Sequence, residues 1–207
     1  MNRIGPESTK ARRIGAEIVF FDEFGFSFQE PLGRTWAPCG QRPVVQRVTS
    51  KRRVLSTAVG LTFSGKIYKH HVQGSFNGLD VIAALKHLQR HISKRCILIW
   101  DRASIHRDRR VKAYLATQPL ISVEWLPAYA PELNPEEYCH SNVKRHLKNA
   151  TPLTSDDIQP LIDRGFARLR KRPDLILSFF HRAGLSVKDL GSCRILGETG
   201  KRSIFWS

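Results

Sequence analysis

The stretch ILIWDRASIH (residues 97–106) runs from four apolar residues into Asp101 and then into a polar and basic tail. A short apolar run of this kind predicts a buried strand, and buried strands of this composition are typical of α/β proteins. A carboxylate that ends such a strand stands where α/β sheets carry their sites. Any strand that meets water can also end on an acid, so Asp101 gains meaning only from other acids near it.

A second apolar run, EIVFFDEFGF (17–26), reaches Asp22 and Glu23 in the same way. Two further runs, 52–63 and 66–74, flank the Ser64-Gly65 pair and predict a β-hairpin. Helical periodicity follows in 75–92, then come strand 96–101, a helix capped by Asp108, strand 121–127 and a helix from residue 136. This order predicts an α/β fold, a mixed five-stranded sheet flanked by helices, in which strands 1 and 4 lie together and bring Asp22 near Asp101.

The composition points to a polyanionic partner. The chain has 34 Lys and Arg against 18 Asp and Glu, a formal net charge of +16 and a pI of about 10.3. Such a positive surface favours nucleic acid, and an acidic membrane surface or acidic protein is the weaker alternative. The four cysteines are far apart and have no zinc-type spacing, so we expect reduced thiols in a cytoplasmic protein. No apolar stretch is long enough for a membrane span.

Carboxylates gathered in so basic a protein indicate a divalent metal site that acts on a phosphodiester. Two Mg²⁺ ions can activate the attacking oxygen and stabilise the leaving oxygen of an in-line displacement. Oxygen ligands suit Mg²⁺ or Mn²⁺ better than zinc. The surrounding Lys and Arg would then hold the DNA backbone.

Three segments carry a family resemblance: FFDEFGF (20–26), ILIWDRASIH (97–106) and LPAYAPELNPEEY (126–138). In this order and spacing they resemble the acidic motifs of DDE transposases of bacterial insertion sequences related to the mariner superfamily. The segment GRTWAPCGQRP (33–43) is similar to the family's linker after the first aspartate. The resemblance implies an RNase H-like fold, and cleavage of double-stranded DNA at transposon ends with Mg²⁺ followed by joining to target DNA.

The resemblance assigns the catalytic and metal-binding acids as Asp22, Asp101 and Glu137. The third acid has an alternative: the Leu-Asn-Pro motif selects Glu137, whereas the family's usual spacing after the second aspartate points to Glu136. We expect Glu137 because an insertion would change the spacing without moving the motif. Asn134 to Glu137 also fits a helix capping box, so a purely structural role for Glu137 stays open.

Basic residues near the motifs are candidates for DNA contacts. We expect Glu23 to lie at the surface or behind the site. Trp36 is expected to pack against other side chains. His106 could contact substrate or orient an acid. The Arg-rich helix of residues 164–172 is expected to end before Pro173. The candidate DNA-binding residues are Arg102, His106, Lys144, Arg145, Arg168 and Lys171.

Two substitutions depart from the family pattern. Arg102 stands where Asn is common, which places a cation beside the site. His140 stands where Trp is common and could loosen the helix that presents Glu137. These departures leave open a catalytically inactive DNA-binding remnant, and an RNase H-like host nuclease acting on RNA–DNA hybrids is the second alternative.

The domain organisation is expected to comprise four segments. They are a basic disordered lead-in (1–15), the RNase H-like DDE catalytic domain (16–150), a helical C-terminal extension of that domain (151–190) and a tail (191–207). Family members begin with helix-turn-helix modules, so we expect a separate helix-turn-helix polypeptide to supply that function. A homodimer and a bacterial, nucleoid-associated location complete the expectation.

Overall fold

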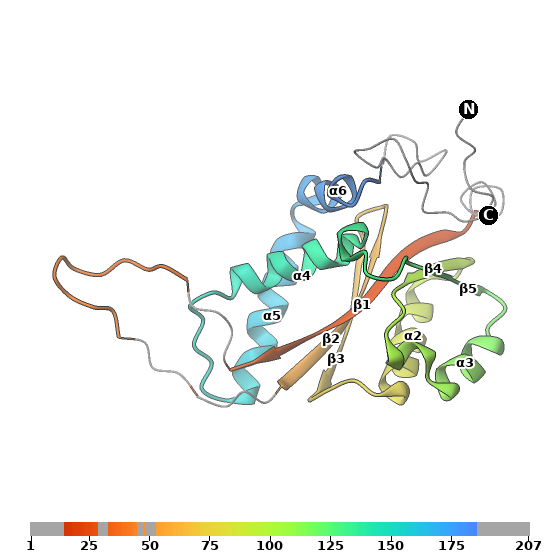
Figure 1. Cartoon of the computed structure of the whole chain (residues 1–207), viewed down its shortest axis with the longest axis horizontal. Coiled ribbons are helices and arrows are strands. Elements are labelled where there is room, and N and C mark those ends of the chain that lie inside the picture. Colours follow the sequence, from red (N-terminus) through yellow and green to blue (C-terminus); the bar gives the residue numbers. More distant parts are fainter. Residues whose placement is uncertain (1–14, 29–32, 45–47, 49–52, 186–207) are drawn as a thin grey trace.

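The computed structural model describes residues 15–28, 33–44, 48 and 53–185. Its centre is a mixed five-stranded sheet with strand order β3-β2-β1-β4-β5, which confirms the predicted α/β architecture. Figure 1 shows helices on both faces of this sheet. The strands are β1 (Glu17–Ser27), β2 (Arg53–Thr62), β3 (Ile67–Gln73), β4 (Cys96–Trp100) and β5 (Ile121–Trp125).

The strand directions follow from the connections. β2 and β3 form the predicted antiparallel hairpin, and Gly65 in its turn has φ of 78°, which favours glycine. β1 is antiparallel to β2 and parallel to β4, and β4 is parallel to β5. The two parallel connections run through helices, as parallel pairing requires.

The alternation of side chains along β1 divides the core into two layers. Phe20 and Phe24 belong to one buried cluster, whereas Val19 and Phe21 belong to the other. The first layer is covered by α4 (Pro135–His146), α5 (Ser155–Arg170) and α6 (Pro173–Arg182). The second is covered by α2 (Gly78–His91) and α3 (Arg109–Ala116). Asp22 has the parity of Phe20 and Phe24, which places it on the α4 face.

Local capping signals set the helix starts. Asp108 caps α3 by accepting a hydrogen bond from the Arg110 N–H at 2.7 Å, as predicted. The capping box of Thr154 and Asp157 begins α5. The expected end before Pro173 is correct, since α5 ends at Arg170, but Pro173 then opens the additional helix α6, which sequence analysis did not separate. Pro at the first helical position needs no N–H partner, so it starts a helix as readily as it ends one.

The segment of residues 33–44 extends away from the sheet (Figure 1). Trp36 within it is 99% exposed, so the expected packing role is wrong. The lead-in up to residue 14 and residues 186–207, which include the predicted tail, lie outside the described residues. Within the described part of the chain, no helix has the length and apolar character to cross a membrane.

Candidate active site

The register between β1 and β4 brings the two aspartates together. The two strands are parallel, and Phe21 pairs with Trp100. Asp22 and Asp101 are the next residues along the two chains, so they lie at the same level, although β4 ends at Trp100 whereas β1 continues to Ser27 and Asp22 pairs with Val59 of β2. Asp101 has the parity of Ile97 and Ile99, whose side chains face the α4 layer as Asp22 does. The two aspartates therefore converge through the pairing register, but the prediction that Asp22 ends its strand is wrong, because pairing with β2 carries β1 on to Ser27.

Asn134 fixes the start of α4 to Asp22. Its Nδ2 donates to Asp22 Oδ2 at 2.9 Å, and its Oδ1 accepts from the Glu136 N–H at 3.1 Å. One amide thus caps the helix and holds the carboxylate. From the sequence alone, Asn134 is expected only as a helix cap, and its position in the Leu-Asn-Pro motif is the one signal there of a second role at the site.

The two candidate third acids point to different environments. Glu137 is exposed and lines the same pocket as Asp22 and Asp101. Glu136 is 0% exposed, and burial raises its pKa well above the usual range, with the Asp22 charge adding to the shift. Asn134 accepts from the Glu136 N–H rather than closing a box with Glu137, which leaves the Glu137 carboxylate free of a capping role.

His140 is part of the core beneath this helix. Its ring stacks on Phe24 with 3.8 Å between ring centroids, and burial lowers its pKa to about 3. A neutral imidazole therefore fills the position next to the sheet. The helix that carries Glu137 is packed at this residue, not loosened by it.

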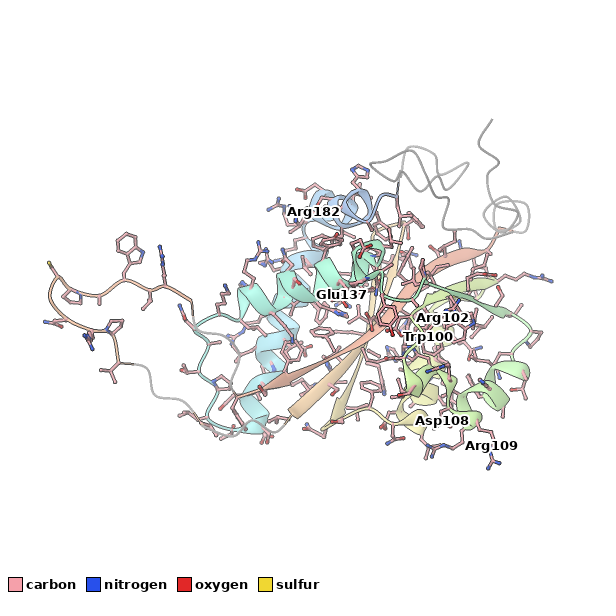
Figure 2. All side chains as sticks on the ribbon, viewed as in Figure 1. Trp100, Arg102, Asp108, Arg109, Glu137 and Arg182 are labelled. Carbon is pink, nitrogen blue, oxygen red and sulfur yellow. The ribbon has the colours of Figure 1, made fainter. Side chains whose placement is uncertain are left out.

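A pocket of about 480 Å³ opens at the carboxyl end of β4, between this strand and the start of α4. Figure 2 labels Glu137 on α4 and Arg102 just after β4, which both line this pocket. Its charged and polar lining residues are Asp22, Asp101, Arg102, Arg107, Asn134 and Glu137.

His106 lies between two acids on the α2 side of this site. Its Nε2 is 2.6 Å from Glu23 Oε2 and its Nδ1 is 2.6 Å from Asp101 Oδ1. Burial opposes the charged ring, but the two carboxylates outweigh it and raise the pKa of His106 to about 9. With 1% exposure, His106 cannot contact DNA, so of its two predicted roles the structure favours orienting an acid. Glu23 is expected from the sequence either at the surface or behind the site, and its contact with the buried His106 places it behind the site.

The charge balance differs between the two aspartates. Burial, together with the negative charges of Glu23, Asp101 and Glu137, raises the pKa of Asp22 to about 8. Burial alone would raise the pKa of Asp101 as well, but hydrogen bonds from His106 and from the Ala103 N–H lower it. Asp22 therefore sits in uncompensated negative potential, which a bound cation would relieve.

The remaining DNA-binding candidates divide by position. Arg102 is exposed and lines the pocket, and Arg107, which sequence analysis did not select, does so too. Arg168 Nη2 is bonded to Asn142 Oδ1, which ties α5 to α4. The candidates outside the pocket lining are Lys144, Arg145, Arg168 and Lys171. Of these basic residues, all of them in the described part of the chain, Arg102 and Arg107 are the ones that line the pocket.

The pocket acids have the donor chemistry of a divalent cation site. Among the described residues, no three His, Cys, Asp or Glu side chains already stand in a metal-holding cluster. The three pocket acids nevertheless provide oxygen donors of the kind that Mg²⁺ prefers. The pKa of Asp22 is raised because burial and neighbouring acids are not offset by a positively charged side chain among the residues that the structure describes. The residues fit a divalent cation by donor chemistry and charge.

Comparison with known proteins identifies the family. The family model of DDE superfamily endonucleases matches residues 17–159, which is more than half of the chain. This match confirms the family inferred from the three acidic motifs. No curated protein sequence matches the chain.

Solved structures with the same fold include several of Mos1 transposase. The catalytic domain of Mos1 mariner transposase is 20% identical, with a TM-score of 0.56 over 92% of this chain and 97% of that chain. A Mos1 mariner paired-end complex with Mn is 21% identical, with a TM-score of 0.61 over 88% of this chain and 61% of that chain. This chain thus spans less than two thirds of the Mos1 chain in that complex. The chain belongs to the DDE superfamily endonucleases, and its RNase H-like fold is that of the mariner transposase catalytic domain.

Proposed function

We propose that this chain is the catalytic domain of an insertion-sequence transposase that cleaves DNA strands at transposon ends and transfers them to target DNA. The observation that carries the proposal is the pocket lined by Asp22, Asp101 and Glu137, in which Asp22 lacks a compensating cation. The proposed substrate is double-stranded DNA, in keeping with the net charge of +16.

The three acids are proposed as ligands of two Mg²⁺ or Mn²⁺ ions. When bound, the metal supplies activation of the attacking oxygen and stabilisation of the leaving oxygen at phosphorus. Structures of Mos1 paired-end complexes with Mn and with Mg support this choice of ion. Glu136 is rejected as a ligand because its carboxyl is enclosed in the core.

Neighbouring side chains hold two of the acids in place. Asn134 donates a hydrogen bond to Asp22 Oδ2. The other carboxylate oxygen of Asp22, Oδ1, accepts a hydrogen bond from the Glu23 N–H at 2.8 Å. His106, itself held by Glu23, donates to Asp101. Such outer contacts fix the orientation of ligands and tune their basicity.

Arg102 and Arg107 are proposed to bind the phosphates on either side of the scissile bond. Both are exposed cations at the pocket, where planar guanidinium groups can bind phosphate oxygens in a bidentate manner. Arg102 thereby becomes a substrate contact beside Asp101, not an obstacle to metal binding. We further propose that recognition of transposon ends comes from a helix-turn-helix module outside these 207 residues, and that the domain acts as a homodimer in the bacterial cytoplasm on the nucleoid.

The proposal is tested by nicking of supercoiled plasmid with the wild-type protein and Asp101→Asn. We expect nicking in Mn²⁺ and Mg²⁺, none in chelator, and none by the variant, which keeps its salt-sensitive DNA binding. Loss of DNA binding in the variant would contradict the separation of catalytic and binding residues.

Two other results distinguish the alternative functions. If neither protein nicks plasmid, even after fusion of a DNA-recognition module, the chain is an inactive DNA-binding remnant. Preference for an RNA–DNA hybrid over duplex DNA would identify a host nuclease of the same fold.

A further inference from the structure

Tyr129 is the most exposed large side chain at the candidate active site. It belongs to the loop between β5 and α4, lines the same pocket as the three acids, and is 101% exposed. Nothing in the described part of the chain covers its ring. A tyrosine so exposed contributes nothing to folding through burial, so its position calls for another explanation.

The backbone at Tyr129 is also strained. Its φ is 60°, in the left-handed region that bulky side chains rarely adopt. Among the described residues, the other non-glycine residue with positive φ is Asn149, which has φ of 65° and whose Oδ1 accepts from the Gly33 N–H at 2.9 Å. Asn149 thus gains a contact from its conformation, whereas the Tyr129 side chain gains none. Strain without an internal contact is characteristic of residues held for a ligand.

The surroundings indicate what that ligand is. Two exposed cations, Arg102 and Arg107, line the pocket and favour phosphate. The rest of the rim near Tyr129 is small: Ala128, Ala130 and Pro131 form no large apolar patch for a protein partner. A single aromatic ring beside phosphate-binding arginines is the arrangement that binds a nucleotide by stacking on its base.

We propose that Tyr129 stacks on an unpaired base of the DNA strand next to the phosphodiester that the acids cleave. This inference rests on the proposed function of the pocket. A base inside a duplex offers only its edges, so the stacked nucleotide must be single-stranded or turned out of the helix. Tyr129 thereby makes strand opening at the cleavage site part of substrate binding.

The test measures binding in chelator, where no cleavage occurs. The full chain is titrated with two DNAs, a short duplex and the same duplex with an unpaired arm carrying 2-aminopurine at the junction. We expect tighter binding of the forked DNA and quenching of 2-aminopurine by stacking. Tyr129→Ala should lose about tenfold in affinity for the fork together with the quenching, and should keep the wild-type affinity for the duplex.

Two variants and one stability measurement serve as controls. Tyr129→Phe keeps a ring without the hydroxyl and should behave like the wild type. Trp36→Ala removes an equally exposed aromatic side chain outside the pocket and should bind both DNAs normally. Tyr129→Ala should also melt at the wild-type temperature, because the ring makes no contact that folding needs.

The outcomes separate this inference from the proposed function. Unchanged fork binding in Tyr129→Ala, equal losses on both DNAs, or the same loss in Trp36→Ala would overturn the stacking role. A fork preference that depends on Tyr129, in a protein that fails to nick plasmid even after fusion of a DNA-recognition module, would support stacking while contradicting the catalytic proposal.

Discussion

Two clusters of ionisable side chains lie on the same face of the sheet, one around Asp163 and one around Asp22. They place these two carboxylates in opposite electrostatic environments. At the edge strand, Asp163 of α5 is bonded to Lys69 and to His71, the latter at 2.9 Å. Burial alone would raise the pKa of Asp163, but these two contacts lower it. At the centre of the sheet, the pKa of Asp22 is raised to about 8, by burial and by three neighbouring acids.

The difference separates an acid whose charge the chain itself compensates from acids that we propose bind a divalent cation. Asp163 meets a cation and an imidazole that the chain supplies, and it ties α5 to β3. Asp22 receives only neutral donors, from Asn134 and from the Glu23 N–H. An acid left in negative potential costs stability, which a protein tolerates where a site needs it.

The largest expected effect comes from exchanging one acid of each cluster for its amide. Asp22→Asn should lower metal-dependent plasmid nicking by about 1,000-fold or more, because it removes a proposed ligand of the metal ions. Asp163→Asn should leave nicking within about twofold of the wild type. Comparable losses in the two variants would show that the central acids have no special role.

Glu137→Gln and Glu136→Gln test the boundary of the central cluster. We expect Glu137→Gln to lower nicking by about 100-fold or more, since Glu137 faces the pocket. Glu136→Gln should have little effect on nicking, because the enclosed carboxyl of Glu136 favours its neutral form, which Gln resembles in shape. The reverse result would make Glu136 the third ligand.

His106→Ala removes the imidazole that lies between Glu23 and Asp101. It should lower the free energy of unfolding by about 3 kcal/mol, the scale for breaking a buried ion pair, as measured by urea denaturation. Its nicking should require about tenfold more Mn²⁺, because Asp101 loses its orientation. A loss of stability without a change in the Mn²⁺ requirement would limit His106 to a structural role.

Asp163→Asn should cost about 1 kcal/mol in the same denaturation experiment, because the carboxylate is partly exposed and solvent screens its contacts. This small loss, without loss of nicking, is the expected signature of a structural acid. Stability equal to the wild type would mean that the edge cluster contributes nothing to folding.

The smallest effect concerns the pH dependence of stability in metal-free buffer. Because the pKa of Asp22 is about 8 in the folded protein and near 3.8 otherwise, the folded state keeps a proton that the unfolded state releases. The free energy of unfolding should therefore fall as pH rises from about 4 to about 8. Asp22→Asn should lack this component, so its stability relative to the wild type should increase as pH rises toward 8. Parallel pH profiles of the two proteins would contradict the raised pKa.

Much of the central site could be predicted because it follows from local patterns. Asp22 and Asp101 each end a recognisable apolar run, and a parallel register between β1 and β4 is enough to bring them together. Glu137 was chosen by its motif, whereas spacing alone pointed to Glu136. The structure adds a physical distinction, since consecutive helix residues face different directions and only Glu137 faces the pocket.

The supporting contacts could not be predicted because they join segments far apart in the sequence. Glu23 and His106 are 83 residues apart and meet only after the loop that follows β4 has folded. Asn134 and Asp22 are 112 residues apart, and nothing in the sequence shows that a helix cap also binds an acid. Trp36 was wrongly assigned to packing because an aromatic residue between prolines and polar residues carries no signal of its exposure.

The most direct test of the account is equilibrium binding of Mn²⁺, followed by electron paramagnetic resonance, in the wild type, Asp22→Asn and Asp163→Asn. We predict equal binding by the wild type and Asp163→Asn, with affinity rising toward pH 8 as Asp22 loses its proton. Asp22→Asn should bind at least about tenfold more weakly. Equal Mn²⁺ affinity in all three proteins, or no binding by the wild type, would contradict the claim that the central acids await a divalent cation.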